Sequence, residues 1–466
     1  MSAARRLIPI MLALAACAPL PHRPRPGTTP WRPRGFVAVG HAGRVGPATA
    51  PRWWRTIGSR PLDALVMAAL RANPSLAVAD ARVRAAIAAL RLRRGGGRLQ
   101  VSAAGRLTAE HFSEQGLHGP ANGQSVLYGE VDPLVARIHV TQFGRIDDEV
   151  RAAFGKVQAA TADRAMARLV VTTRIVRAYF AAEAARAERA YWRAMRGDAR
   201  RLLMLARIRR RDGLSGAHAV DGDEERLNDA SQGYREAATR LARLRNGLGA
   251  LAGRGPAFGR GVVLAALPAQ SRLPLPSRIP LALVARRPDI VAARRLVAVA
   301  AARVGAARAA FYPDVNLVFF AGWNSISLRD LFDPMNLARA VGPTVTLPIF
   351  EGGTLRARLA GQDAAFAAAR AQYREALVTA VREVADGVAR LRRERHDLAS
   401  ETQAGRAAHR QVTLARQAFR AGLASRAPWL QADEAWWRER ARQAALRAAR
   451  AATWARIEEA IDGQAD

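Results

Sequence analysis

Two long stretches of the chain lack proline and consist mainly of residues that favour helices. No proline occurs within residues 134–255 or 349–427. Proline removes a backbone donor and clashes with the preceding turn, whereas Ala, Arg, Leu and Glu favour helices. We therefore predict one helix over about 144–211 and another over about 353–420, each roughly 100 Å long at ~1.5 Å per residue. Helices of this length are typical of coiled-coil or tubular proteins.

The predicted elements recur in the same order in both halves of the chain. Short helices are expected to start at Pro74 and Pro288, with apolar residues spaced to give each helix one apolar face. Both lead into segments rich in β-branched and aromatic residues, and then into the long helices. Turns at Gly213 and Gly422 lead from the long helices into a final helix. This order predicts an internal duplication.

Each half is predicted to contribute two strands around a polar loop. The first pair covers about 99–110 and 131–142, and the second covers about 314–326 and 340–350. Four strands cannot close a barrel, and an open sheet edge cannot face lipid. No mature segment has the ~20 consecutive apolar residues of a membrane helix. Strands in a membrane would therefore have to be pooled, and three copies would supply about twelve, an even number that suits an outer-membrane barrel.

The first residues have the pattern of an export signal. Arg5 and Arg6 precede a short apolar run that ends in Leu-Ala-Ala-Cys at Cys17. This ending is similar to a bacterial lipobox, in which the cysteine receives a lipid and becomes the mature N-terminus. Cys17 is the only cysteine, so it has no disulfide partner. We expect residues 1–16 to be removed. An ordinary signal peptide with a chance cysteine is the alternative.

The chain is strongly basic and shows no pattern of catalytic residues. It has 73 Lys and Arg against 39 Asp and Glu, a net charge of +34. Such a balance can indicate a nucleic-acid partner, but the arginines are spread along an exported chain with few aromatics between them. No HExxH, Gly-rich phosphate loop or Gly-x-Ser-x-Gly elbow occurs. We expect no nucleic-acid partner, no enzyme activity, no metal and no cofactor except a covalent lipid on Cys17.

A family resemblance is carried by residues 283–317, which read LVARRPDIVAARRLVAVAAARVGAARAAFYPDVNL. This segment closely resembles the signature of the outer-membrane factors of bacterial tripartite efflux pumps, the TolC/OprM-like lipoproteins of the NodT family. Residues 347–356 (LPIFEGGTLR), residues 142–145 (QFGR) and the two Gly-Leu turns are similar as well. The resemblance covers nearly the whole mature chain.

The resemblance implies a mainly α fold with membrane β-strands. It implies a TolC-like α/β-barrel with internal duplication, in which a homotrimer forms a twelve-stranded outer-membrane β-barrel and a long periplasmic α-helical barrel. The implied function is a passive exit duct of a tripartite efflux pump in the outer membrane. Its implied partners are a periplasmic adaptor (membrane fusion) protein, an inner-membrane efflux transporter and outer-membrane lipid. An exported basic coiled-coil structural lipoprotein without channel activity is the alternative, but it leaves the strand pairs unexplained.

With this resemblance, the chain is divided into five segments, and its loops and helices are assigned to opposite sides of the outer membrane. The segments are a lipoprotein signal peptide (1–16), an extended leader (17–60), a first repeat (61–255), a linker (256–280) and a second repeat (281–463). Loops 113–127 and 327–339 are expected to be extracellular, and the long helices periplasmic.

Certain residues of the resembling segments are expected to shape the backbone. Pro288 suits a first helical turn, and a neighbouring carboxylate complements the positive helix end. A Gly-Gly pair lets the backbone turn sharply from a strand into a long helix. These structural motif residues are Arg287, Pro288, Asp289, Gly144, Gly352 and Gly353.

Acidic residues stand just beyond each Gly-Leu turn of this basic chain. Threefold symmetry would multiply each inward carboxylate into a ring that favours cations, so we predict a periplasmic gate at these turns. Nearby arginines such as Arg207 and Arg226 are expected to pair with it. Carboxylates that only complement helix dipoles are an equal alternative. The gate residues are Asp221, Asp223, Glu224, Asp433 and Glu434.

Overall fold

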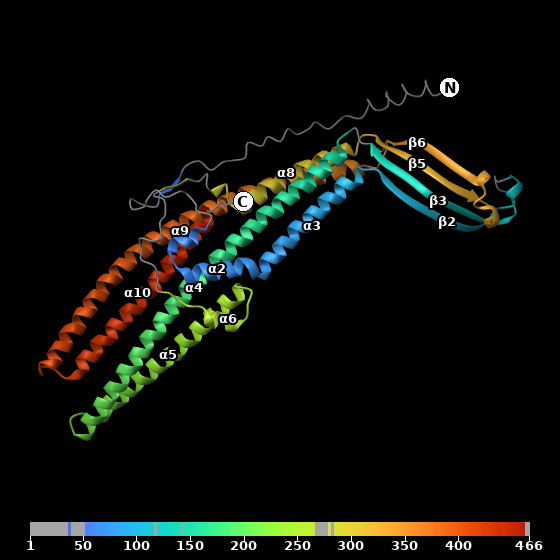
Figure 1. Ribbon diagram of the computed structural model, residues 1–466. Coiled ribbons are helices and arrows are strands. Elements are labelled where there is room, and N and C mark those ends of the chain that lie inside the picture. Colours follow the sequence, from blue (N-terminus) through green and yellow to red (C-terminus); the bar gives the residue numbers. More distant parts are fainter. Residues whose placement is uncertain are drawn as a thin grey trace. The chain divides into compact units, whose positions relative to one another are not determined.

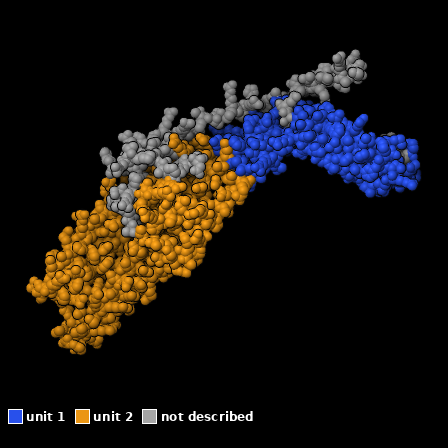
Figure 2. Space-filling view, in the orientation of Figure 1, with its two compact units in different colours: residues 1–31, 85–157, 295–371 blue, residues 32–84, 158–294, 372–466 orange. Residues whose placement is uncertain are grey.

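The computed structural model describes residues 36–38, 52–115, 119–140, 143–265, 278–280 and 284–461. These residues form two compact units, which Figure 2 colours separately. The described part of unit 1 lies within residues 85–157 and 295–371, and that of unit 2 within residues 32–84, 158–294 and 372–466. Each unit takes residues from both halves of the chain, so neither unit is one sequence repeat.

Helices make up most of the described chain (Figure 1). The short helices predicted at Pro74 and Pro288 begin at those residues. The described residues also include the 3-10 helices η1 (Trp53–Ile57), η2 (Gly119–Ala121), η4 (Leu328–Asp330) and η5 (Pro334–Asn336). The α-helices are α2 (Arg60–Ala72), α3 (Pro74–Gly96), α4 (Arg145–Arg211), α5 (Ala217–Leu251), α6 (Pro256–Gly261), α8 (Pro288–Ala309), α9 (Thr354–Arg420) and α10 (Arg426–Ile461).

The two longest helices have equal length and end in the same way. Helices α4 and α9 each contain 67 residues, which confirms the prediction from the proline-free stretches. Each is followed by a glycine with positive φ, Gly213 or Gly422. The next residue donates its N–H back to the last turn, over 2.7 Å from Leu214 and 2.9 Å from Leu423. Both ends are therefore Schellman motifs, and the duplication extends to the helix ends.

Four strands form one antiparallel sheet in unit 1, in the order β2-β3-β5-β6 (Figure 1). Strands β3 and β5 pair with each other, so the central ladder joins the two halves of the chain. Strands β2 and β6 are the edges, and the outer side of each has no partner strand within the described ranges. The bounds are β2 (Gln100–His111), β3 (Ser125–Val140), β5 (Asp314–Ser325) and β6 (Leu337–Thr346).

Two predicted strand bounds were wrong. Strand β3 begins at Ser125 rather than near 131, because its ladder with β2 continues as far as the Ser125–His111 pair. Strand β6 starts earlier than predicted and ends at Thr346. Pro348 has no N–H for a ladder bond, which explains why the strand stops before it. The loops predicted over 113–127 and 327–339 therefore contain the first residues of β3 and β6.

A short strand pair in unit 2 was not predicted from the sequence. Strand β1 (Phe36–Ala38) pairs antiparallel with β4 (Arg278–Pro280). Three-residue strands are too short to show alternation in a sequence. Part of the predicted leader is thus tied to the linker between the repeats.

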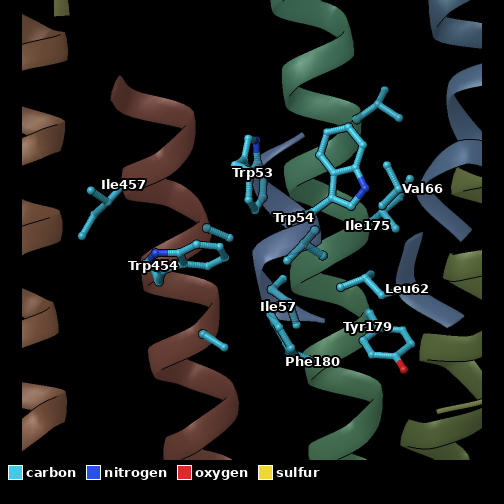
Figure 3. Packing of buried hydrophobic residues seen from close by; sticks show 14 of the residues in the cluster. Trp53, Trp54, Ile57, Leu62, Val66, Ile175, Tyr179, Phe180, Trp454 and Ile457 are labelled. Atoms are coloured by element: carbon cyan, nitrogen blue, oxygen red, sulfur yellow. The ribbon is translucent and has the colours of Figure 1, made fainter. Parts of the chain in front are cut away.

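The largest apolar core lies in unit 2 and holds residues of the predicted leader against helices of both repeats (Figure 3). Trp53 of η1 meets Trp454 of α10 edge to face, with ring centroids 5.3 Å apart. Trp54 is buried, and its indole N–H donates to Asp63 Oδ1 over 2.9 Å. Tyr179 of α4 lies in the same core. The 3-10 turn is therefore part of the folded body of unit 2.

Close helix packing in unit 1 depends on glycine. A Cβ at Gly155 of α4 would lie 2.7 Å from Val299 Cγ2 of α8. A Cβ at Gly305 of α8 would overlap the Asp148 carboxylate of α4. These distances are too short for two atoms that are not bonded, so α4 and α8 approach each other at positions where only glycine fits.

Among the described helices, none is by itself both long and apolar enough to cross a bilayer. The bent pair α2 and α3 meets that test only when both helices are taken together, and only by length and composition. Helix α2 buries Leu62, Val66 and Ala69 completely in the core of unit 2.

Candidate functional site

The four-stranded sheet has one apolar face and one polar face. Side chains alternate along each strand, and the strand register shows which residues share a face. Arg339 is the only Asp, Glu, Lys or Arg residue on the apolar face. That face carries Leu107, Leu127, Val131, Ile138, Val140, Val315, Leu317, Phe319, Trp323, Leu337, Val341, Pro343 and Val345. The polar face carries Arg106, Glu110, Glu130, Asp132, Arg137, Asp314 and His139.

The residues that the structure describes leave the apolar face uncovered within a single chain. Val341 is 69% exposed and Leu107 is 60% exposed. A contiguous apolar face of this kind marks a surface that meets protein or membrane. An outward apolar face with an inward polar face is the pattern of membrane-barrel strands. The two free edges, β2 and β6, also need partners.

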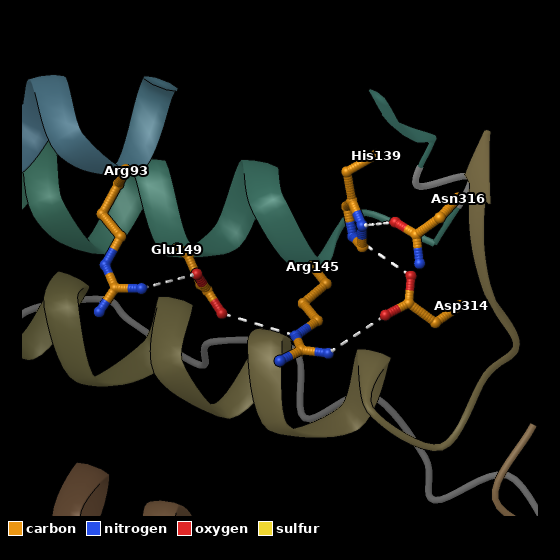
Figure 4. A network of polar contacts seen from close by, with 6 residues as sticks. All are labelled: Arg93, His139, Arg145, Glu149, Asp314 and Asn316. Carbon is orange, nitrogen blue, oxygen red and sulfur yellow. Dashed lines mark hydrogen bonds and ion pairs between the residues drawn. The ribbon is translucent and has the colours of Figure 1, made fainter. Parts of the chain in front are cut away.

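A chain of polar contacts joins the ends of the strands to the helices of unit 1 (Figure 4). His139 Nε2 lies 3.3 Å from Asp314 Oδ1, and Asp314 Oδ2 lies 3.8 Å from Arg145 Nη1. Arg145 Nε lies 3.5 Å from Glu149 Oε1, whose second oxygen lies 3.3 Å from Arg93 Nη1. These side chains are partly exposed, so each pair contributes at most about 1 kcal/mol. Together they align the strand ends with α3 and α4.

The predicted glycines lie where strands give way to long helices. Gly144 precedes α4 with a φ of 76°, and Gly352 and Gly353 precede α9 with φ values of 57° and 85°. L residues rarely adopt this left-handed region. The chain can therefore turn sharply into both long helices, as the Gly-Gly motif predicted for α9.

The predicted helix-start motif forms an ion triad around the buried Arg287 in unit 2. Arg287 is only 5% exposed. Its Nη2 donates to Asp289 Oδ2 over 2.7 Å, and its Nη1 donates to Glu383 Oε2 over 2.7 Å. Asp289 Oδ1 also accepts the N–H of Ile290 over 2.8 Å in the first turn of α8, which starts at Pro288. The motif thus caps α8 and ties it to α9.

Burial and pairing act in opposite directions on Arg287. Burial by itself lowers the pKa of the guanidinium, but the hydrogen bonds and charges of Asp289 and Glu383 raise it above its usual value. Glu383 was not identified from the sequence. It lies 96 residues away in the middle of a long helix, where an exposed glutamate carries no distinguishing pattern.

The acidic residues at the first helix tip are mostly solvated. Glu224 accepts a bond from Arg207 over 2.7 Å, and both side chains are exposed. Asp223 accepts a bond from Arg226 over 2.9 Å. Asp221 is exposed and forms no ion pair within the described residues. The expected arginine pairs with Glu224 and Asp223 are therefore present.

The acidic residues near the second tip are more buried than those near the first. They lie close to acidic residues of α4 and α5, the two helices joined by the first Gly-Leu turn. Glu434 of α10 is 9% exposed, and its Oε1 is buried without a hydrogen-bond partner. Burial raises the pKa of Glu434. The nearby Asp198 and Asp223 raise it further, against the opposing charges of Arg226 and Arg438.

Asp433 and Asp198 are part of the same acidic group. Burial raises the pKa of each, and the nearby charge of Asp433 raises the pKa of Asp198 further. Asp198 of α4 is 4% exposed and pairs with Arg201 over 2.7 Å. Helices α4 and α5 form one hairpin, and α9 and α10 form the other. We name Asp198, Asp223, Asp433 and Glu434 the inter-hairpin carboxylates, because they come from α4 and α5 of the first hairpin and α10 of the second.

The helix-dipole explanation for the tip carboxylates does not hold. Neither α5 nor α10 has an acidic residue in its first turn, and the dipole acts only within that turn. Asp198 was missed in the sequence, although a signal existed. It lies between Met195 and Leu202, both of them buried, at a spacing that puts all three on one helix face.

The predicted lipidation site cannot be placed in the described part of the chain. Cys17 and the signal residues 1–16 lie outside the described residues. Within those residues, no group of three or more His, Cys, Asp or Glu side chains could hold a metal ion.

Comparison with known proteins gives consistent matches. The profile of a family described as outer membrane efflux protein matches residues 65–254 and 279–463. The chain is 27% identical over 429 residues to the multidrug resistance outer membrane protein MdtQ of Escherichia coli O6:H1, covering 89% of this chain and 88% of that protein. It is 29% identical over 331 residues to the fusaric acid resistance protein FusA of Burkholderia cepacia, covering 70% and 62% respectively.

Solved structures show the same architecture. The outer membrane protein VceC of Vibrio cholerae superposes with a TM-score of 0.78 at 27% identity, covering 89% of this chain and 98% of that one. The CmeC outer membrane channel of Campylobacter jejuni superposes with a TM-score of 0.86, covering 94% and 93%. CmeC is only 18% identical, so that likeness concerns the fold.

Proposed function

The chain belongs to the outer membrane efflux protein family, and from this premise we propose that it is the exit duct of a tripartite efflux pump. Family membership and the structural matches confirm the predicted family, the TolC-like fold class, the efflux-channel function and the outer-membrane location. The finer proposal is a homotrimer that passively conducts small molecules outward. In it, a periplasmic adaptor and an inner-membrane transporter supply the substrate.

The single observation that carries the proposal is a sheet with an apolar face and two free edges. Strands β2 and β6 run antiparallel to each other, because they stand three places apart in an antiparallel sheet. The β6 edge of one copy can therefore continue into the β2 edge of the next as an antiparallel ladder. Three such sheets supply twelve strands, which suits a closed outer-membrane barrel. Closing the barrel gives the unpaired backbone N–H and C=O groups of β2 and β6 hydrogen-bond partners, and lipid covers the apolar face.

The rest of the proposal follows from this duct. It moves substrate without a covalent step, so we propose no catalytic residue. A lipid on Cys17 would anchor the mature N-terminus, and mass spectrometry of protein extracted from membranes would detect it. No observation favours the alternative of a structural coiled-coil lipoprotein, because such a protein has no use for the sheet.

A pair of neighbouring substitutions tests the barrel. Val341→Arg puts a charge on the apolar face, where lipid burial costs about 2–4 kcal/mol at mid-depth. Ala340→Arg puts the same charge on the polar face of the same strand. We expect wild type and Ala340→Arg to form heat-resistant trimers that conduct in planar bilayers, and Val341→Arg to form neither trimers nor channels. Equal behaviour of the two variants, or a monomeric wild type without conductance, would refute the barrel.

A further inference from the structure

The loop between β5 and β6 folds back onto the apolar face of the sheet. Gly129 of β3 lies on that face, opposite Leu107 of β2. A Cβ at Gly129 would lie 3.1 Å from Leu328 Cδ2 and 3.2 Å from Leu331 Cδ2 of the loop. Leu331 is buried. The glycine therefore leaves room for two leucines, which hold the loop against the apolar face rather than over the polar face.

An aromatic contact holds the loop to the same face and leaves apolar side chains exposed. Phe332 meets Trp323 of β5 edge to face, with ring centroids 5.9 Å apart. Phe332 is nevertheless 67% exposed, and Met335 is 89% exposed. Ile326, at the start of the loop, is exposed as well. We name Ile326, Phe332 and Met335 the loop patch, and a patch of this kind marks a surface that meets protein or membrane.

The loop patch belongs to a loop that contacts the two central strands of the sheet. Gly129 and Trp323, the two contacts of the loop, come from β3 and β5. In the proposed trimer, neighbouring copies join at β2 and β6 instead. The edge of a neighbouring sheet therefore does not cover the loop patch, and the cover that remains is membrane lipid.

Arg339 stands on the apolar face close to the loop. It is the third residue of β6, about 7 Å along the strand from the end of the loop. It pairs with Ala321 and is a diagonal neighbour of Trp323. Its side chain is exposed and forms no ion pair or hydrogen bond with the residues that the structure describes. The guanidinium therefore has no paired counter-charge within the described chain.

Neither the loop nor a neighbouring copy supplies that counter-charge. Asp333 Oδ1 accepts the N–H of Met335 over 2.8 Å within its own turn. In the proposed barrel, β2 of the next copy lies beside β6, and the apolar face of β2 carries no Asp or Glu. An arginine that faces lipid in such surroundings needs an anion from outside the protein.

We infer that the loop patch and Arg339 bind a phosphorylated, multiply acylated lipid of the outer leaflet, with Arg339 on its phosphate. The inference rests on the proposed barrel, which turns the apolar face to lipid and puts the loop on the extracellular side. A guanidinium binds phosphate through two parallel charge-assisted hydrogen bonds. The arginine stem lies along apolar surface while the charged end reaches the headgroups. The loop patch supplies apolar contacts to the acyl chains.

The test is lipid retention by purified full-length trimers, measured by native mass spectrometry. The two probes have identical acyl chains: diphosphorylated lipid A and its fully dephosphorylated form. Wild type should retain the diphosphorylated probe about tenfold more tightly, the difference expected from a hydrogen bond to a charged group. Arg339→Gln should lose this preference, and Arg339→Lys should keep part of it. Heat-resistant trimers confirm that each variant has assembled.

Two further variants are controls for the charge and for the apolar contacts. Arg106→Gln removes a positive charge from the polar face of the sheet and should leave the preference for the diphosphorylated probe unchanged. Phe332→Ser with Met335→Ser removes apolar contacts only. It should weaken the retention of both probes by the same factor and keep the preference between them.

The possible results separate the inference from the proposed function. Equal retention of the two probes by wild type, or an undiminished preference in Arg339→Gln, would overturn the inference and leave the duct intact. Pairs of trimers that form without added lipid, and that disappear in the Phe332→Ser, Met335→Ser variant, would assign the loop patch to a second trimer and also overturn it. Absence of any conducting wild-type trimer would overturn the proposed function itself.

Discussion

The two repeats start their short helices at equivalent positions with different chemistry. Before Pro74, Asn73 caps α3 by accepting the N–H of Ser75 over 2.8 Å, and its Nδ2 donates to the Leu251 carbonyl over 2.7 Å. Before Pro288, Arg287 binds one carboxylate in its own first turn and a second carboxylate on α9. Each residue is nearly buried and ties a helix start to a segment distant in sequence.

The difference shows that the two repeats keep the same helix start more strictly than they keep the side chain that stabilises it. A neutral amide needs only a correctly placed carbonyl, and its loss leaves neutral groups unpaired. A buried guanidinium needs carboxylates, and their loss leaves a charge that costs far more to bury. The second repeat should therefore be the more sensitive of the two to substitution at its helix start.

The largest effect is expected when Arg287 loses both carboxylates. Asp289→Asn with Glu383→Gln would leave a guanidinium that is 5% exposed without either of the carboxylates that hydrogen-bond to it. Breaking a buried pair in this way costs about 3–5 kcal/mol. Circular dichroism in detergent should show a clear fall in melting temperature.

Removing the arginine instead of its carboxylates should cost less stability. In Arg287→Met the freed Asp289 and Glu383 side chains are 36% and 48% exposed, so water can solvate both. We expect a cost nearer 1–2 kcal/mol, about that of losing charged hydrogen bonds. A melting temperature lower for Arg287→Met than for the double variant would contradict the assignment of the buried charge.

A smaller effect is expected in the first repeat. Asn73→Ala removes the cap and leaves the Leu251 carbonyl without its side-chain donor, at a cost of about 1–2 kcal/mol. The melting temperature should fall by less than in the Asp289→Asn, Glu383→Gln variant. An equal or larger fall would show that the two helix starts do not differ in the proposed way.

The two helix tips should differ in how their carboxylates make folding stability depend on pH. Glu434 is buried near Asp198 and Asp223, with Arg226 and Arg438 opposing them, and its pKa is raised above the ordinary value of 4.5. A carboxyl with a raised pKa binds its proton more tightly in the folded state. Folding stability therefore falls as the pH rises from the unfolded pKa through the folded pKa.

Glu434→Gln should remove this loss of stability. The variant mimics the protonated form, so its melting temperature should exceed that of wild type above the raised pKa and match it in acid. Glu224→Gln, at the exposed first tip, is the control and should show no such pH dependence. A constant difference between Glu434→Gln and wild type at all pH values would refute the buried-carboxyl explanation.

The smallest effect is expected from two carboxylates of the first tip, the exposed Asp221 and the partly buried Asp223. Asp221→Ala with Asp223→Ala removes two charges per chain, one of them paired with Arg226. If these residues help to close a gate, conductance in planar bilayers should rise and cation preference should fall modestly. Unchanged conductance and selectivity would show that neither Asp221 nor Asp223 helps to close a gate.

Much of the architecture could be predicted because it depends on local chemistry. Proline-free composition specified two helices of 67 residues, and the glycine turns specified their ends. Strand bounds were less accurate, since β3 gains its first residues by pairing with β2 rather than from its own pattern. The candidate site was predicted in part, because acidic residues beyond the turns are visible in sequence whereas their burial is not.

The sequence by itself determined the duplication, the long helices, the four strands and the family. These features arise from periodicity, proline placement and short motifs, all of which act over a few residues. Only the tertiary structure decided that Arg287 meets Glu383, that Asp198 joins Glu434 and that Leu331 lies over Gly129. Each of these pairs is far apart in the chain. Helix packing and strand register place such partners together, and no local pattern of residues encodes that proximity.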